Sequence, residues 1–303
     1  MILKNSIKLK IQRAVTIALI SSGIIPAIQA EVTDQNVNNP SGTTITNGST
    51  SYAVDLDSGG PYTVINAGTI STVKATSTIS AIEIDEVAVT TLTNTGTMSA
   101  ETVRSGAFGI HSYTYNDTTS ITTLTNSGTI SGESGIDNGN GIWLETYYAD
   151  NSITTLTNSG TISGEAGNSL GYGVRLSSYY ADASITTLTN TATISGSAGT
   201  DGYGVYLYSY DADASITTLT NSGTISGEAG TDGYGIYLYT GHPGSGNSTI
   251  TNLTNKGTIS GSTYDIWNKD EDIINFNNQQ GKDGNDVLTY NGKLPTNYNV
   301  IVN

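Results

Sequence analysis

The stretch SITTLTNSGTISGEAG occupies residues 152–167 and recurs letter for letter at residues 215–230. A near copy, SITTLTNSGTISGES, begins at Ser120. The Leu-Thr-Asn element and its relatives place an Asn at positions 47, 66, 94, 126, 158, 190, 221 and 255. Successive positions differ by 19, 28, 32, 32, 32, 31 and 34 residues. A period that settles near one value indicates a repeat architecture.

A second marker follows the same period and supports the same conclusion. It is an aliphatic residue in sequences such as Gly-Tyr-Gly-Val-Arg-Leu, and it falls at Val54, Ile82, Ile110, Ile142, Val174, Val205, Ile236 and Ile266. Each repeat contains three short runs with the alternating pattern of β-strands, separated by Gly, Asp, Ala and Ser. Alternation places Leu188, Ile194, Val205 and Leu207 on one face and Thr or Tyr on the other. Apolar residues at helical spacing are absent from the repeats.

Three strands in one repeat cannot bury their apolar face alone, whereas stacked repeats can. The sequence therefore predicts an all-β, right-handed parallel β-helix of about eight three-strand coils. A structural Asn column is expected at one corner, where stacked amides bond from coil to coil. Its members are Asn66, Asn94, Asn126, Asn158, Asn190, Asn221 and Asn255. Ala192 replaces the usual Gly of this corner, which predicts that the position does not require a positive φ.

The chain divides into four predicted segments. Residues 1–30 form a signal peptide, with a basic start that includes Lys4 and Arg13, an apolar run at 14–25 and a cleavage site after Ala30. Residues 31–60 form an N-terminal cap and first short coil, and residues 61–268 form the β-helix repeats. Residues 269–303 form a degenerate final coil or a truncated continuation. Export is therefore expected.

Composition excludes some partners. Without residues 1–30, which hold four of the 11 bases and no acid, 7 bases face 26 acids, a net charge of −19. Nucleic-acid binding is not expected, because phosphates are held mainly by Lys and Arg. The chain has no Cys, and a solenoid needs no disulfide. No apolar run after the leader is long enough for a transmembrane helix.

The Leu-Thr-Asn-Ser-Gly-Thr-Ile-Ser-Gly unit behind an export signal resembles the β-helical passenger domains of Gram-negative autotransporters (type V secretion). The stretch LTYNGKLPTNYNVI at 288–301 is also similar to segments that follow such repeats. The resemblance implies a passenger at the cell surface or outer membrane, or a secreted one, with roles in adhesion or virulence. It also implies an outer-membrane translocator. The sequence supplies no alternating barrel strands, so the translocator is expected in cis beyond this sequence or in trans. Without a translocator the chain is expected in the periplasm.

An aromatic stripe is the main candidate for ligand binding. Its outward positions on the third strand and beside it are Trp143, Arg175, Tyr206, Tyr208, Tyr237, Tyr239 and Trp267. Flat rings on a rigid ladder can stack on sugars, so a host or extracellular glycan or protein is the expected partner. The alternative is that these rings pack on the next coil.

Other patterns give weaker hypotheses. Thr pairs that flank an inward Leu, such as Thr155 and Thr157, resemble the flat face of ice-binding β-solenoids. Loop acids such as Glu133, Glu165 and Glu228 recur at the repeat spacing, which predicts a ladder of like charges rather than an acid/base pair. The run GKDGNDVL at 281–288 resembles one calcium-binding nonapeptide, but a single copy reads more simply as a turn.

These observations predict no catalytic residues, no metal site and no cofactor. The expected function is a non-catalytic exported β-helix that acts as a passenger-like surface structural or adhesion module. A stand-alone carbohydrate-binding or ice-binding solenoid is the alternative, and a polysaccharide-active enzyme is the weakest one.

Overall fold

The computed structural model describes residues 28–29, 32–46, 51–242, 246–268, 273–278, 289–292 and 297–300. In these ranges every regular element is a β-strand, and no helix is long and apolar enough to cross a membrane. Most of the predicted signal peptide lies outside the described residues. Asn47 and the calcium-like run at 281–288 lie outside them as well.

The strands form three parallel sheets. Sheet A contains β1 (Ile28–Gln29), β4 (Thr44–Thr46), β7 (Thr69–Lys74), β10 (Thr97–Thr102), β13 (Thr129–Ser134), β16 (Thr161–Ala166), β19 (Thr193–Ala198), β22 (Thr224–Ala229) and β25 (Thr258–Gly261). Sheet B contains β2 (Val32–Thr33), β5 (Tyr52–Leu56), β8 (Ile79–Asp85), β11 (Ala107–Thr114), β14 (Gly139–Thr146), β17 (Leu170–Ser178), β20 (Asp201–Ser209), β23 (Asp232–Thr240), β26 (Tyr264–Asn268) and β28 (Tyr290–Gly292). Sheet C contains β3 (Val37–Asn39), β6 (Tyr62–Asn66), β9 (Ala88–Asn94), β12 (Thr119–Asn126), β15 (Asn151–Asn158), β18 (Ala183–Asn190), β21 (Ala214–Asn221), β24 (Ser248–Asn255), β27 (Ile273–Asn278) and β29 (Asn297–Val300).

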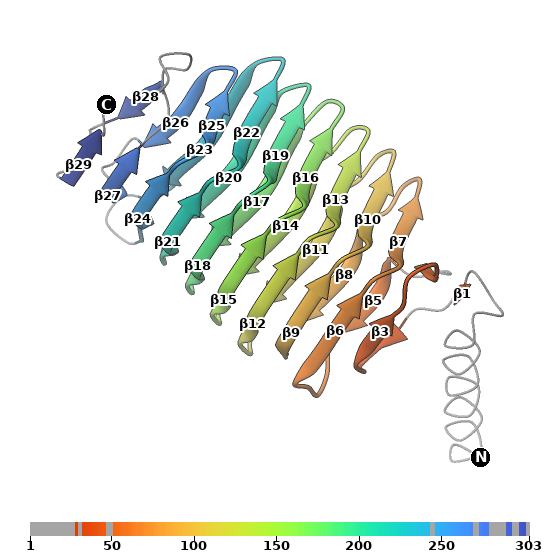
Figure 1. Ribbon diagram of the computed structural model, residues 1–303. Helices are drawn as coiled ribbons and strands as arrows, with labels where there is room; N and C mark the ends of the chain where they lie inside the picture. Colours follow the sequence, from red (N-terminus) through yellow and green to blue (C-terminus); the bar gives the residue numbers. More distant parts are fainter. Residues whose placement is uncertain are drawn as a thin grey trace, which may run out of the picture.

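Each coil contributes one strand to each sheet, and the coils stack along one axis (Figure 1). The predicted all-β, right-handed parallel β-helix with three strands per coil is confirmed. The strands from β6 to β26 make seven complete turns, and shorter strands extend the stack at both ends. Equivalent residues pair directly, as Leu156 does with Leu124 and Leu188. Nearly identical repeats therefore stack in register.

The core fills the space between the three sheets. Leu156, Ile162 and Val174 represent its three columns, one from each sheet, and all three have 0% exposure. Gly204 interrupts the alternation in β20, because a Cβ there would lie 2.5 Å from the Gly235 carbonyl oxygen and 2.7 Å from Ile225 Cγ2. Its neighbour Val205 belongs to the main core, and Tyr203 belongs to a separate aromatic cluster.

The corner glycines pack closely against the backbone of the preceding coil. A Cβ on Gly160 would lie 2.1 Å from the Gly128 carbonyl oxygen of the preceding coil. Neither Gly160 nor Ala192 has a positive φ, so the prediction about Ala192 is confirmed. Proximity between coils, rather than a left-handed backbone, therefore favours glycine at this corner, and Ala192 shows that one coil accommodates a Cβ there.

The corner asparagines form one continuous buried ladder. Nδ2 of each Asn donates to Oδ1 of the next at 2.7 to 2.9 Å, from Asn39 through the predicted column to Asn278. Most members also donate to a threonine carbonyl oxygen in the next coil, as Asn158 does to Thr193 at 2.9 Å. Asn39 pairs with Asn66, which places Asn39 at the corner of the first coil.

Candidate functional site

The predicted aromatic stripe lies on the outer face of sheet B as a continuous stack. The rings of Tyr206 and Tyr237 are 5.5 Å apart and 8° from parallel, and Trp267 continues the stack at 5.7 Å and 17°. Arg175 fills the gap in the stack, with its guanidinium carbon 4.4 Å from the Trp143 ring centroid and 5.9 Å from that of Tyr206. The column thus has cation–π contacts on both sides of Arg175 and π-stacked rings from Tyr206 to Trp267.

A second row of tyrosines lies beneath this stack. Tyr172, Tyr203 and Tyr234 are buried, and their rings stack on one another at 5.0 and 5.6 Å. Tyr203 also meets the Tyr206 ring edge-to-face at 4.9 Å. Burial raises the pKa of Tyr203 well above its usual value. Sequence reasoning missed this row, although the repeated Gly-Tyr-Gly placed a tyrosine beside each backbone bend.

This packing limits how the stripe can bind a sugar. The stacked rings cover one another's faces, so a sugar ring meets mainly ring edges. Tyr208 and Tyr239 also stack, at 5.8 Å and 22°, and Tyr239 keeps 36% of its surface exposed. The glycan-binding role of the stripe stays a prediction, and the geometry favours its edges over its faces.

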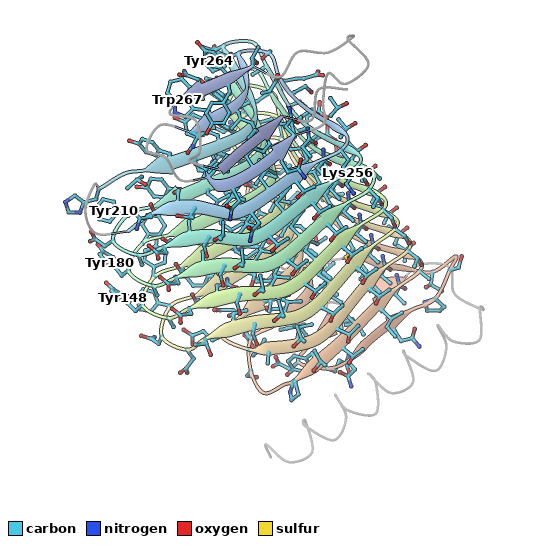
Figure 2. All side chains as sticks on the ribbon, turned by 60° about the vertical axis from the view of Figure 1, so that its left-hand side comes forward. Tyr148, Tyr180, Tyr210, Lys256, Tyr264 and Trp267 are labelled. Atoms are coloured by element: carbon cyan, nitrogen blue, oxygen red, sulfur yellow. The ribbon has the colours of Figure 1, made fainter. Side chains whose placement is uncertain are left out.

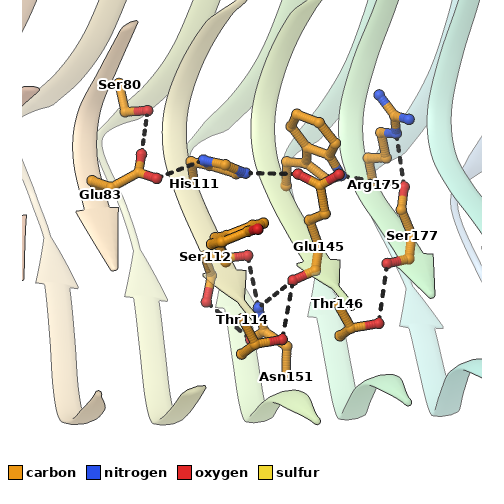
Figure 3. A network of polar contacts seen from close by, with 12 residues as sticks. Ser80, Glu83, His111, Ser112, Thr114, Glu145, Thr146, Asn151, Arg175 and Ser177 are labelled. Carbon is orange, nitrogen blue, oxygen red and sulfur yellow. Dashed lines mark hydrogen bonds and ion pairs between the residues drawn. The ribbon is translucent and has the colours of Figure 1, made fainter. Parts of the chain in front are cut away.

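An ion-paired histidine, His111, lies next to Trp143, at the end of the stripe where two glutamates face it (Figure 3). The two ring nitrogens of His111 donate to Glu83 at 2.8 Å and to Glu145 at 3.3 Å. Burial lowers the pKa of His111, but the two carboxylates outweigh burial and raise it to about 10. Ser80 Oγ donates to the second oxygen of Glu83 at 2.7 Å. His111 is thus a protonated structural bridge at neutral pH and has no free lone pair for base chemistry.

Further polar contacts connect this bridge to the edge between sheets B and C. Ser112 Oγ donates to Asn151 Oδ1 at 2.9 Å, and Asn151 Nδ2 donates back to the Ser112 carbonyl oxygen at 2.7 Å (Figure 3). Both residues are fully buried. These bonds tie β11 to β15, the strand that follows β14, the neighbour of β11 in sheet B, so the network is structural.

Two acidic features have perturbed pKa values. Burial, helped by Glu86 and Glu83, raises the pKa of Asp85 to about 6, and Asp85 Oδ1 is buried without a hydrogen-bond partner. In sheet A, Glu133 pairs in register with Glu165, and burial together with this neighbour raises its pKa. Within the described ranges, no three His, Asp or Glu side chains gather in a way that could hold a metal ion.

Sheet C differs from the other two sheets in its charge. None of its ten described strands contains a charged residue, although the chain has a net charge of −15. Thr155 pairs in register with Thr123 and Thr187, and Thr157 pairs with Thr125 and Thr189. All of these threonines are partly exposed. We call this outer surface the hydroxyl face, defined by the threonine columns of β9, β12, β15, β18 and β21.

The loops between sheets B and C expose a further set of aromatic side chains. We call Tyr115, Tyr148, Tyr180, Tyr210 and His242 the tyrosine edge. Tyr148 and Tyr180 are 59% and 51% exposed. The sequence contains this feature as a repeated Tyr-Tyr-Ala-Asp at 147–150 and 179–182, outside the predicted stripe.

Comparison with known proteins adds no assignment. No family model, no curated protein and no solved structure matches the chain. The parallel β-helix is compatible with a passenger domain. The resemblance to autotransporters therefore depends on the repeat, the leader and the tail motif.

Proposed function

We propose that this protein is a non-catalytic, exported β-helix that serves as a passenger-like structural and adhesive module of a cell surface. The hydroxyl face carries the proposal. It offers a neutral, regularly spaced array on a strongly acidic molecule, at about 4.8 Å between coils. A neutral or ordered partner can approach this face without meeting fixed charge.

The interior supports a rigid rod. The Asn ladder runs unbroken through the corner, and the apolar columns of the three sheets continue from coil to coil. Each coil is bonded to both neighbours along its whole length, so a local bend would break several buried bonds together. Such a rod holds a binding surface at a fixed distance from its attachment point.

The setting of the protein follows from its leader and repeat. We place the exported chain at the Gram-negative cell surface or outer membrane, or outside the cell, with a translocator supplied in cis or in trans. The partner on this proposal is a glycan or protein of a host or of the extracellular surroundings. The acidic charge argues against nucleic acid.

The alternative is a solenoid that works alone on carbohydrate or ice. The same hydroxyl face favours it, because threonines present a methyl and a hydroxyl at each lattice point. The two functions differ in partner: adhesion requires a specific surface, whereas ice binding requires frozen water only.

The test compares charges placed on two faces of the same coils. Thr155→Lys with Thr187→Lys places two cations on the hydroxyl face, and Ser163→Lys with Ser195→Lys places two on sheet A. Both variants and the wild type, without residues 1–30, are assayed on a glycan array, on insoluble neutral polysaccharides and on cell surfaces. We expect the threonine variant to lose binding and the serine variant to retain it.

Three other outcomes change the conclusion. Equal binding by both variants would remove the hydroxyl face from the proposal. Thermal hysteresis in the wild type that the threonine variant lacks would establish the ice-binding alternative. Release of reducing ends from any glycan would overturn the non-catalytic assignment.

A further inference from the structure

The tyrosine edge brings phenol side chains of consecutive coils into parallel contact in solvent. The rings of Tyr148 and Tyr180 have their centroids 5.3 Å apart and lie 9° from parallel. More than half of each side chain is exposed, at 59% and 51%. Figure 2 shows Tyr148, Tyr180 and Tyr210 one above another along one side of the rod, opposite Lys256. This pair is both aligned and accessible.

The backbone fixes the alignment. The Tyr148 amide donates to the Tyr115 carbonyl oxygen at 3.2 Å, and the Tyr180 amide donates to that of Tyr147 at 3.1 Å. Two residues later, the Asp182 amide donates to Asp150 Oδ1 at 3.1 Å. The two loops are thus bonded to each other on both sides of the ring pair, so the phenols stay in register without needing a partner molecule.

We propose that Tyr148 and Tyr180 form an oxidative cross-linking site that joins two consecutive coils covalently as dityrosine. The oxidant is a haem peroxidase working with hydrogen peroxide. It removes one electron and one proton from each phenol, which gives two adjacent tyrosyl radicals. The radicals couple through one ring carbon ortho to each oxygen, and each of these carbons then returns its proton to its oxygen. Overall, two tyrosines and one hydrogen peroxide give one dityrosine and two waters.

Other tyrosine pairs in the described residues meet these conditions less well. Tyr172 and Tyr203 stack at 5.0 Å and 11°, but they are buried and out of reach of a protein oxidant. Tyr180 and Tyr210 lie 6.2 Å apart with their rings nearly perpendicular, at 85°. Tyr147 and Tyr179 stack at 4.8 Å but are only partly exposed. Exposure and alignment coincide best at Tyr148 and Tyr180.

The cross-link has a structural consequence for a chain without Cys. It closes a loop from residue 148 to residue 180, which is one full coil, and so restricts the unfolded chain as a disulfide does. Oxidation therefore strengthens the rod instead of damaging it. This inference does not depend on which partner the hydroxyl face binds.

The experiment uses the chain without residues 1–30 at low concentration, treated with a haem peroxidase and hydrogen peroxide. The monomer fraction is isolated and its dityrosine fluorescence measured. Its proteolytic peptides are then searched by mass spectrometry for a 148–180 link that has lost two hydrogens. We expect this link to dominate, and we expect Tyr148→Phe and Tyr180→Phe each to abolish it and to lose most of the fluorescence. Tyr172→Phe and Tyr210→Phe, as buried and perpendicular controls, are expected to leave it unchanged.

The treated wild type is also expected to unfold at a higher urea concentration than the treated Tyr148→Phe variant, whereas the untreated proteins unfold together. Dityrosine in the monomer that lies mainly at other pairs would overturn the proposal, as would its persistence at full level in Tyr148→Phe. Absence of any dityrosine in the monomer would overturn it as well. Oxidation in urea provides the reference, because the preference for this pair must vanish once the coils separate.

Discussion

Replacing Asn158 by Ala removes the central member of the buried ladder. Asn158 Nδ2 donates to Asn190 Oδ1 at 2.8 Å and to the Thr193 carbonyl oxygen at 2.9 Å, and its Oδ1 accepts from Asn126 Nδ2 at 2.8 Å. Asn126 keeps the Thr161 and Gly128 carbonyls as acceptors, whereas Asn190 Oδ1 loses this donor. One buried acceptor loses its ladder bond, and four further groups lose a bond: the Thr193 carbonyl, Asn126 Nδ2, and the amide and carbonyl of Gly160. The free energy of unfolding is therefore expected to fall by about 2–4 kcal/mol.

Urea unfolding followed by circular dichroism measures this change against two controls. Asn168→Ala, at an exposed loop position, is expected to lie within about 0.5 kcal/mol of the wild type. Asn39→Ala, at the first described rung, removes a bond to one neighbouring asparagine instead of two and is expected to cost less than Asn158→Ala. A loss at Asn158 no larger than at Asn168 would refute the reasoning that the ladder holds the coils together.

Three further predictions concern the outer face of sheet B and its bend. His111→Gln should lose stability relative to the wild type. Because folding raises the pKa of His111 from 6.5 to about 10, the difference is full below pH 6.5 and disappears as pH rises through about 10; a pH-independent difference in urea midpoint would contradict the ion-pair assignment. Arg175→Ala should lower the free energy of unfolding by about 1–2 kcal/mol by opening the ring stack, and a Trp143 emission spectrum unchanged from the wild type would contradict the contact. Gly204→Ala should destabilise by about 2 kcal/mol or more, since its Cβ has no space, and a neutral result in thermal unfolding would show that the bend can open.

The fold could be predicted from sequence because each core position recurs in several repeats. Leu124, Leu156 and Leu188 recur at one spacing, and in-register stacking is the arrangement that buries all of them together. The same argument did not find Asn39, which occupies the corner of the first coil, because the spacing changes there. Periodicity locates members of a column, but it cannot locate an end where the spacing changes.

Candidate sites were less predictable, because side-chain contacts between columns are not periodic. His111 pairs in register with Trp143 of the stripe, yet its partner Glu145 lies in the adjacent column one coil further on. Tyr203 is separated from Val205 by a single glycine, and only the backbone bend at Gly204 assigns the two to different layers. Diagonal contacts and bends depend on three-dimensional geometry that alternation alone does not contain.

Stacking identical coils has an electrostatic cost in the charged columns and none in the neutral ones. Glu133 has a raised pKa because burial and its in-register neighbours Glu165 and Glu101 both disfavour its charge. In the coil after Glu165 this column carries Ser197, so Glu165 and Glu228 are separated by a neutral residue beside a shallow hollow. The threonine columns of sheet C carry no such electrostatic cost, and each further rung of the Asn ladder adds a bond of the same length, 2.8 Å within its interior. Added coils therefore extend the hydroxyl face without the electrostatic cost that the acidic column carries, which makes the hydroxyl face the surface that duplication enlarges most readily.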